Sequence, residues 1–361
     1  MIDNYKAFMD RLLIMTMERK ATDLHLCVGT YPLMRINSKL VPVPDTEIIK
    51  PDMMDAIVQM YLNDEQFERL KQNKTVDMSY SKRDLGRFRC NFYLQRGTYA
   101  LALRTLPLNI PDLQELGLPD VTDGFLEKTK GLVLITGATG SGKSTTLASM
   151  IKMINERYRY HITTIEDPVE YLHKHNKSMV TQKEIGSDAL SFSSALRSAL
   201  REDPDVIMLG EMRDMETISI ALTAAETGHL VLSTLHTNGA VKAIDRILDA
   251  FPTEQQNQVR SQLATVLEGI ISQQLVPRCD QQGITLASEV MVVTPAVRNL
   301  IRDGKHYQIN NLIQNGMSQG MRSLERNLAK LVKEDIISEQ EGHIRSGDVQ
   351  LFNTYYNQSY T

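Results

Sequence analysis

The sequence predicts an α/β protein with two domains, a small α+β domain followed by a larger domain built on a mostly parallel sheet. Apolar and polar side chains alternate over residues 87–93, as in a strand with one buried face. Beyond three closely spaced prolines, near-continuous apolar runs alternate with helical stretches, which is typical of a parallel sheet covered on both faces. At about 150 residues per domain, the 361 residues suffice for two.

The prolines at positions 107, 111 and 119 place the domain boundary, because proline-rich connectors commonly separate domains. We therefore expect an N-terminal domain over residues 1–107, a linker over 108–119 and a second domain over 120–361.

The first domain is expected to begin with an amphipathic helix and to continue with short strands. A helix is expected after Pro51, since proline is well placed to open one. The last element is a hairpin whose turn lies at residues 95–97. The expected strands are 23–28, 33–36, 87–93 and 100–104.

The second domain is expected to alternate strands and helices before a mostly helical final third. The expected strands are 131–136, 161–165, 205–209 and 230–234, and the expected helices are 143–157 and 214–227. Three further periodic runs, 254–275, 295–303 and 321–335, are expected to be helical.

Composition excludes several classes of function. The formal net charge of -4 gives no basic footprint for nucleic acid, which is therefore not an expected partner. The N-terminus has charges among its apolar residues, so it is not a signal peptide, and no run is long enough to span a membrane. The three cysteines, without metal-ligand spacing, fit a reducing, cytosolic setting.

A phosphate-binding loop is the strongest chemical signal. Residues 137–144 match G-x-x-x-x-G-K-[ST] between an expected buried strand and an expected helix. Backbone N–H groups would bind the phosphates, Lys143 would reach the outer ones and the Ser144 hydroxyl would bind Mg²⁺. The expected cofactors are ATP and Mg²⁺. The expected nucleotide-binding residues are Gly137, Ala138, Thr139, Gly140, Ser141, Gly142, Lys143, Ser144 and Thr145.

Carboxylates follow two of the expected strands. After strand 205–209 comes Gly210, where many such proteins have an aspartate, so Glu211 is expected to serve the Mg²⁺ through water. After strand 161–165, Glu166, Asp167 and Glu170 surround a proline, and Glu170 is the favoured base for the attacking water. The alternative is that these acids are solvated loop residues.

Two histidines flank the strand at 230–234. His236 follows the strand, at the edge where such sheets bind their ligands, so it is the better candidate for sensing the γ-phosphate. His229 precedes the strand and need not share that role. Either ring could instead be purely structural.

Arg89 and Arg104 lie on opposite arms of the expected hairpin, near paired positions. Two adjacent arginines on the small domain could stabilise charge at the nucleotide of a neighbouring subunit. They could equally be a solvated strand face.

Together these motifs resemble the secretion ATPases, and within them the retraction motors of type IV pili. The resemblance spans nearly the whole chain. Its segments are residues 21–25, 137–144, 165–170, 210–214, 223–229, 233–236 and 296–303. The last of these resembles the retraction motif AIRNLIRE and departs from it at Val297 and Asp303.

The resemblance implies a PAS-like N-terminal domain and a RecA-like ATPase domain in a homohexameric cytoplasmic ring. ATP would lie between the domains, and Arg89 and Arg104 would complete its binding site as arginine fingers. Glu170 would be the base and Glu211 would serve the metal, while His229 and His236 match the family's histidine box. Its partners would be a PilC-like inner-membrane platform protein and an accessory retraction ATPase, and the ring would be peripheral to the membrane.

Two features of the family bear on the direction of the motor. Extension and type II secretion ATPases usually carry an extra N-terminal domain and a tetracysteine zinc motif, and neither is expected here. The alternatives are an extension or secretion ATPase, a weakly hydrolysing accessory paralogue, and a RecA-like DNA motor, which the acidic balance disfavours.

Overall fold

The computed structural model describes residues 2–107, 109–281 and 283–358 and divides into two compact units. Unit 1 comprises residues 1–109 together with Pro168–Leu172, and unit 2 comprises the rest. The expected linker begins at residue 108, outside the described residues. Within that segment, Leu113 and Leu118 are buried in a core of unit 2.

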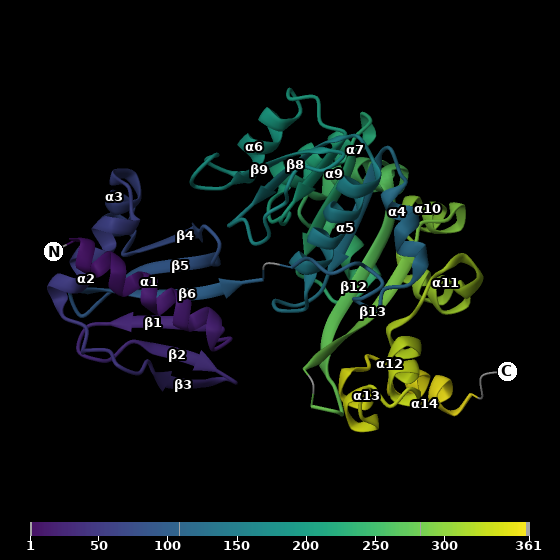
Figure 1. Ribbon diagram of the computed structural model, residues 1–361. Helices are drawn as coiled ribbons and strands as arrows, with labels where there is room; N and C mark the ends of the chain where they lie inside the picture. Colours follow the sequence, from purple (N-terminus) through teal and green to yellow (C-terminus); the bar gives the residue numbers. More distant parts are fainter. Residues whose placement is uncertain (1, 108, 282, 359–361) are drawn as a thin grey trace. The chain divides into compact units, whose positions relative to one another are not determined.

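Unit 1 is an antiparallel sheet with helices on one face (Figure 1). The strand order is β3-β2-β1-β6-β5-β4. Apolar residues of α1 and α2, among them Leu12 and Ile57, pack on the sheet residues Leu24, Phe88 and Leu101. Its elements are α1 (Ile2–Glu18), β1 (Asp23–Cys27), β2 (Leu33–Ile36), β3 (Lys39–Pro42), α2 (Pro51–Tyr61), α3 (Asp64–Asn73), β4 (Thr75–Lys82), β5 (Gly86–Gln95) and β6 (Thr98–Leu106).

The expected hairpin is confirmed in strands β5 and β6. Gln95 pairs with Thr98, and the two residues between them, Arg96 and Gly97, have φ of 49° and 79°. Positive φ at both central residues matches the twist of a tight two-residue hairpin turn.

Unit 2 is a seven-stranded sheet of order β13-β12-β7-β11-β10-β8-β9, in which β13 alone is antiparallel to its neighbour. Its elements up to β11 are α4 (Asp123–Leu126), β7 (Gly131–Thr136), α5 (Lys143–Arg157), β8 (His161–Glu166), β9 (Met179–Glu184), α6 (Phe192–Ala199), β10 (Val206–Leu209), α7 (Met215–Glu226) and β11 (Leu230–Leu235). Beyond β11 lie α8 (Ala240–Asp249), α9 (Thr253–Val266), β12 (Leu267–Pro277), β13 (Ile284–Val292), α10 (Pro295–Arg302), α11 (Ile309–Asn315), α12 (Leu324–Lys333), α13 (Glu339–Arg345) and α14 (Val349–Asn357).

Helices cover both faces of this sheet, as expected from its apolar strands. Leu132 and Leu134 of β7 join the core beneath α6 to α10, whereas Val133 and Ile135 join the core beneath α4 and α5. Successive side chains of a strand point to opposite faces, so a fully apolar strand fills two cores. The last helices, α12 to α14, form a separate small core at the end of the β12–β13 hairpin (Figure 1).

The helix expected over residues 254–275 is wrong in its second half. The helix α9 ends at Val266, and residues 267–277 form β12, which pairs with β7 on one side and β13 on the other. A Cβ at Gly269 would lie 2.2 Å from the Phe125 ring, so the strand passes there because glycine leaves room. Pairing with β7 and β13, and the room left by Gly269, favour a strand here over the helix that the apolar periodicity predicts.

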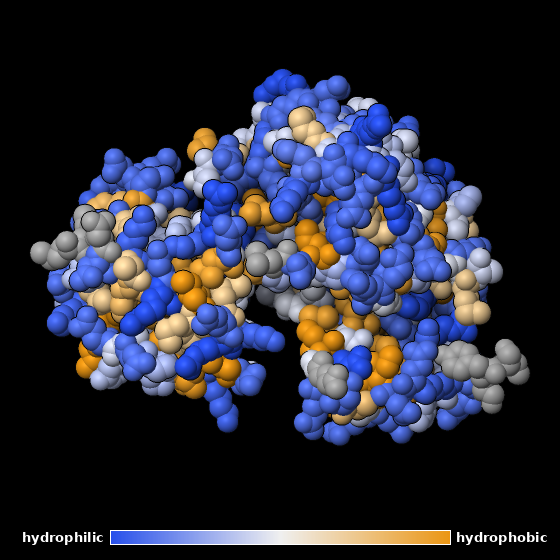
Figure 2. Space-filling view, in the orientation of Figure 1, coloured by the Kyte–Doolittle hydropathy of each residue, from blue (hydrophilic) through white to orange (hydrophobic). Residues whose placement is uncertain are grey.

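The outer surface is mainly hydrophilic on the face shown in Figure 2, with scattered apolar side chains. Within the described ranges, none of the helices combines the length and the apolar character needed to cross a membrane.

Candidate active site

The carboxyl ends of the parallel strands form the edge of unit 2 where the expected site residues collect. In register, Thr136 of β7 pairs with Leu235 of β11, and Leu209 of β10 pairs with Ile165 of β8. The phosphate-binding loop of residues 137–144, called the P-loop below, follows β7, while Glu211 follows β10 and His236 follows β11. Parallel sheets bind their ligands at this edge.

The P-loop makes a tight turn from β7 into α5. Gly137, Gly140 and Gly142 have φ of 146°, 79° and 89°, a region that residues with a Cβ rarely adopt. Ala138, Thr139 and Gly140 are exposed at the tip, and α5 begins at Lys143. The loop therefore exposes backbone at the positive end of a fifteen-residue helix, which favours an anion.

Lys143 and Ser144 follow the loop in the first turn of α5. The Lys143 side chain is largely buried, and its Nζ donates to the carbonyl oxygens of Gly137 and Ala138, both at 2.9 Å. Ser144 is exposed, and Thr145 beside it is half-buried. An ammonium held inside the loop and an exposed hydroxyl at its end suit a phosphate and its metal.

Glu211 is the centre of a polar cluster after β10. One carboxylate oxygen is ion-paired with Arg213, and Oε2 lies 3.3 Å from Nε2 of His236. The hydrogen bond to Glu211 raises the pKa of the Arg213 guanidinium. His236 is exposed, whereas the Glu211 side chain is 12% exposed. The structure thus brings together two residues that were expected to act at the γ-phosphate and its metal.

The acids at the end of β8 and beyond it divide between the two units. Glu166 is buried and accepts hydrogen bonds from Thr164 at 2.7 Å and Gln182 at 3.3 Å. Glu170 lies in the segment grouped with unit 1, where Arg87 Nε donates to the Val169 carbonyl oxygen at 2.9 Å. The expected base is therefore grouped with the unit that carries Arg89 and Arg104.

His229 lies at the opposite end of β11 from His236. Its Nδ1 is 3.0 Å from the Ala224 carbonyl oxygen, and its own carbonyl accepts from Gly131 at the start of β7. Six strand residues of about 3.3 Å each separate the two rings. The structure does not bring His229 into the Glu211 cluster of its own chain.

Arg89 and Arg104 are direct partners across β5 and β6. Arg104 Nε donates to Asp23 at 3.0 Å, and Arg89 lies 3.8 Å from Asp77. Burial alone would raise the pKa of Asp23, but hydrogen bonds from Thr22 and Arg104 lower it.

The polar residues of β12 were not expected at the site. Gln273 Nε2 donates to the Ser141 carbonyl oxygen, and Ser272 Oγ accepts from Gly239 N in the loop after β11. The missed signal is a Ser-Gln-Gln run within an apolar segment, which is unusual in a buried strand.

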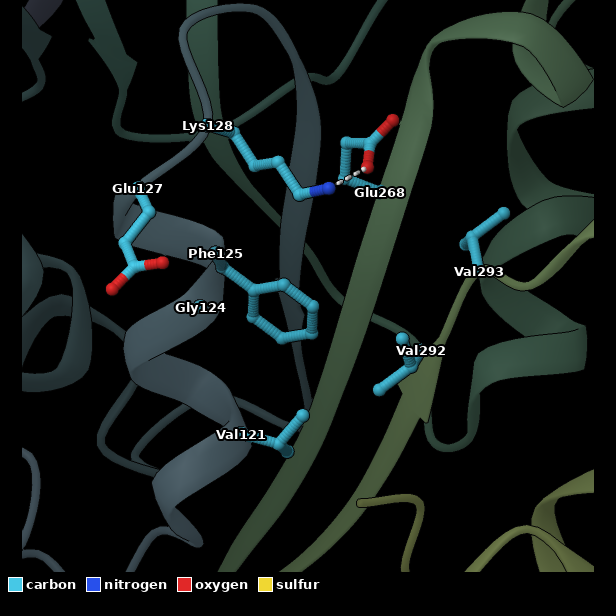
Figure 3. Close-up of a pocket in the computed structure, with 8 residues that line it drawn as sticks. All are labelled: Val121, Gly124, Phe125, Glu127, Lys128, Glu268, Val292 and Val293. Carbon is cyan, nitrogen blue, oxygen red and sulfur yellow. Dashed lines mark ion pairs between the residues drawn. The ribbon is translucent and has the colours of Figure 1, made fainter. Parts of the chain in front are cut away.

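A separate cavity of about 400 Å³ lies near the amino ends of β7 and β12 (Figure 3). Phe125 and Val292 line it, and Lys128 and Glu268 form a 3.0 Å ion pair beside it. Because the P-loop follows the carboxyl end of β7, this cavity does not belong to the candidate active site.

The chain is similar to known proteins over most of its length. The family model described as Type II/IV secretion system protein matches residues 8–343. The chain is 44% identical to the type IV pilus retractation ATPase PilT of Pseudomonas aeruginosa over 91% of this chain and 95% of that protein. It is also 44% identical to a twitching motility protein of Neisseria gonorrhoeae, over 87% of this chain and 84% of that one. A crystal structure of the pilus retraction motor PilT with bound ADP superposes with a TM-score of 0.89 at 45% identity, covering 95% of this chain and 98% of that chain.

Proposed function

Because the chain belongs to the type II/IV secretion system protein family, we propose that it is an ATP-hydrolysing motor that drives type IV pilus retraction and twitching motility. The observation that carries the proposal is the shared strand edge, where the P-loop, Glu211 and His236 follow neighbouring parallel strands. Relatives named for pilus retraction and twitching motility, matched over most of their length, supply the direction.

Nucleotide binding is assigned to residues 137–145. The backbone N–H groups of the loop and the Lys143 ammonium bind the phosphates, which are then at the positive end of α5. The Ser144 hydroxyl offers a hard oxygen ligand that would suit Mg²⁺, and the Glu211 carboxylate would serve the ion through water. When bound, Mg²⁺ neutralises charge on the phosphates.

Hydrolysis then requires a base and charge stabilisation. We assign the base to Glu170, and the sensing of the γ-phosphate to His236, which contacts Glu211. His229, at the far end of β11, is assigned to the family's histidine box without a contact to that cluster. Arg89 and Arg104 act as fingers on the nucleotide of a neighbouring subunit, which requires a ring, and we propose a homohexamer.

Force transmission is assigned to the segment 296–303, which forms most of α10. Arg298 secures this helix, because it donates to the carbonyl oxygens of Ala264 and Thr265 and pairs with Glu268 at 2.6 Å. Ala296, Asn299 and Arg302 lie on its exposed side. The partners we propose are a PilC-like platform protein and an accessory retraction ATPase, which would place the ring at the cytoplasmic face of the membrane.

Deletion of the gene tests the direction of the motor. We expect pili to accumulate on the cell surface while twitching is lost, with recovery on expression of the wild-type chain but not of Lys143→Ala. Loss of pili on deletion would instead identify an extension or secretion motor.

A further inference from the structure

The side chain of Gln273 bridges the P-loop and the first turn of α5 from the neighbouring strand β12. We propose that Gln273 is a positioning residue that directs a phosphate-binding N–H of the P-loop. The inference rests on the proposed nucleotide binding, and it adds a residue outside the 137–145 segment to that site.

Both polar atoms of the Gln273 amide have hydrogen-bond partners, and the residue is 3% exposed. Nε2 donates to the Ser141 carbonyl oxygen at 2.9 Å, and Oε1 accepts from the Thr146 hydroxyl at 3.0 Å. A carbonyl oxygen can only accept, so the nitrogen must face Ser141 and the oxygen must face Thr146. The amide therefore has one orientation.

This contact fixes the peptide plane between Ser141 and Gly142. In a trans peptide the C=O and the following N–H point in opposite directions. With the Ser141 carbonyl oxygen held towards β12, the Gly142 N–H is directed away from β12. Converging N–H groups of this kind make the anion-binding concavity of a P-loop.

Two side chains thus shape the two halves of the loop. Lys143 holds the carbonyl oxygens of Gly137 and Ala138, and Gln273 holds that of Ser141. Backbone contact adds to this, since a Cβ at Gly137 would lie 2.3 Å from the Gln273 carbonyl oxygen. The loop is therefore seated on β12 by both the backbone and the side chain of one residue.

ADP binding to the purified chain tests the inference. Gln273→Met keeps the length of the side chain and removes the donor that holds the Ser141 carbonyl oxygen. We expect the Kd for ADP to rise about ten- to hundredfold, the effect of losing one hydrogen bond to a charged group, here the bond from the Gly142 N–H to a phosphate. The KM for ATP should rise more than kcat falls, because ADP and ATP share the inner phosphates. Gln274→Met is the matched control, because Gln274 donates to the Arg345 carbonyl oxygen instead, and its Kd should match the wild type.

A second variant makes the test independent of how the first one folds. Gln273→Glu removes the donor when it is ionised and restores an O–H donor when it is protonated. Burial raises the pKa of such a carboxyl, so ADP affinity should increase about tenfold more than that of the wild type between pH 8 and pH 6. Gln274→Glu should follow the wild type.

The outcomes separate the two proposals. A wild-type chain that does not bind ADP would remove the proposed function itself. A wild-type chain that binds ADP, with Gln273→Met equal to it in Kd and Gln273→Glu equal to it in pH dependence, would overturn the role of Gln273 alone.

Discussion

Arg89 and Arg104 face one another directly across the β5–β6 pair, in unit 1, while the P-loop is in unit 2. Two guanidinium groups side by side repel each other, and here Asp77 and Asp23 offset part of that repulsion. These two acids hold the arginines in place. The Arg104 side chain is 66% exposed, so its ion pair with Asp23 does not bury its charge.

Exchange of subunits tests whether these arginines act between chains. Arg89→Ala and Lys143→Ala homomers should each lose hydrolysis, and mixtures should recover part of it, because some interfaces combine an intact P-loop with an intact finger. Steady-state ATPase rates over a series of mixing ratios measure this. Exposed ion pairs contribute about 0–1 kcal/mol, so the Tm of Arg89→Ala should stay near that of the wild type. Activity that never exceeds the two homomers at any ratio contradicts a shared site.

Glu211→Gln separates binding from hydrolysis. The amide keeps the shape of the side chain and removes its charge, so we expect ATP binding to persist while kcat falls about a hundredfold or more, in line with the loss of a group used in the transition state. Fluorescent nucleotide binding and phosphate release measure the two quantities.

Glu170→Gln should give the same pattern of retained binding and lost hydrolysis, because a base acts on the attacking water and not on nucleotide binding. Normal turnover in this variant would remove Glu170 as the base. A matched acid outside the site is Glu254, exposed in the first turn of α9, whose change to Gln should leave kcat unchanged.

Gly137→Ala tests the seating of the loop on β12. The added methyl group would meet the Gln273 carbonyl oxygen and the Ser141 hydroxyl, so we expect a loss of stability of about 1–3 kcal/mol and loss of ADP binding. Thermal unfolding and calorimetry measure the effects. Gly124→Ala in α4, where a Cβ would have no neighbour within 4 Å, should bind ADP normally with an equal or higher Tm. Normal ADP binding by Gly137→Ala would show that the loop tolerates a shift of β12.

The burial of the His173 side chain predicts that the stability of the folded protein depends on pH. Burial lowers the pKa of this histidine to about 4, below its value near 6.5 in an unfolded chain. The unfolded state therefore binds the proton more readily, and stability is lost as the pH falls from about 6.5 towards 4, by about 1 kcal/mol or more. The Tm of the wild type should fall over this range, and that of His173→Asn should fall less. Parallel profiles for the two proteins would contradict this.

Much of the sheet could be predicted because its signals are local. The helix α5 has the predicted bounds, 143–157, since a glycine loop precedes it and Lys143 begins its first turn. Buried strands such as β7 are recognised by unbroken apolar runs. The strand β12 could not be predicted, because its partner β7 lies far away in the sequence and its residues also fit a helical period.

That one error explains which site residues went unrecognised. The contacts of Ser272 and Gln273 can be foreseen only once β12 is placed beside β7. There the Gln273 side chain contacts the P-loop, and the Ser272 side chain contacts the loop after β11. The sequence already places His229 before the strand at 230–234 and His236 after it, and in the structure the length of β11 separates the two rings.

The position of β12 also limits how the chain can change in length. Glu268 pairs with Arg298 of α10, and Gln273 contacts Ser141, five residues further along one strand. One inserted residue between them would reverse the faces of every later side chain in the strand. The Gln273 amide would then point away from the P-loop while Glu268 kept its place. Insertions should therefore be tolerated in the turn between β12 and β13 and not within these five residues.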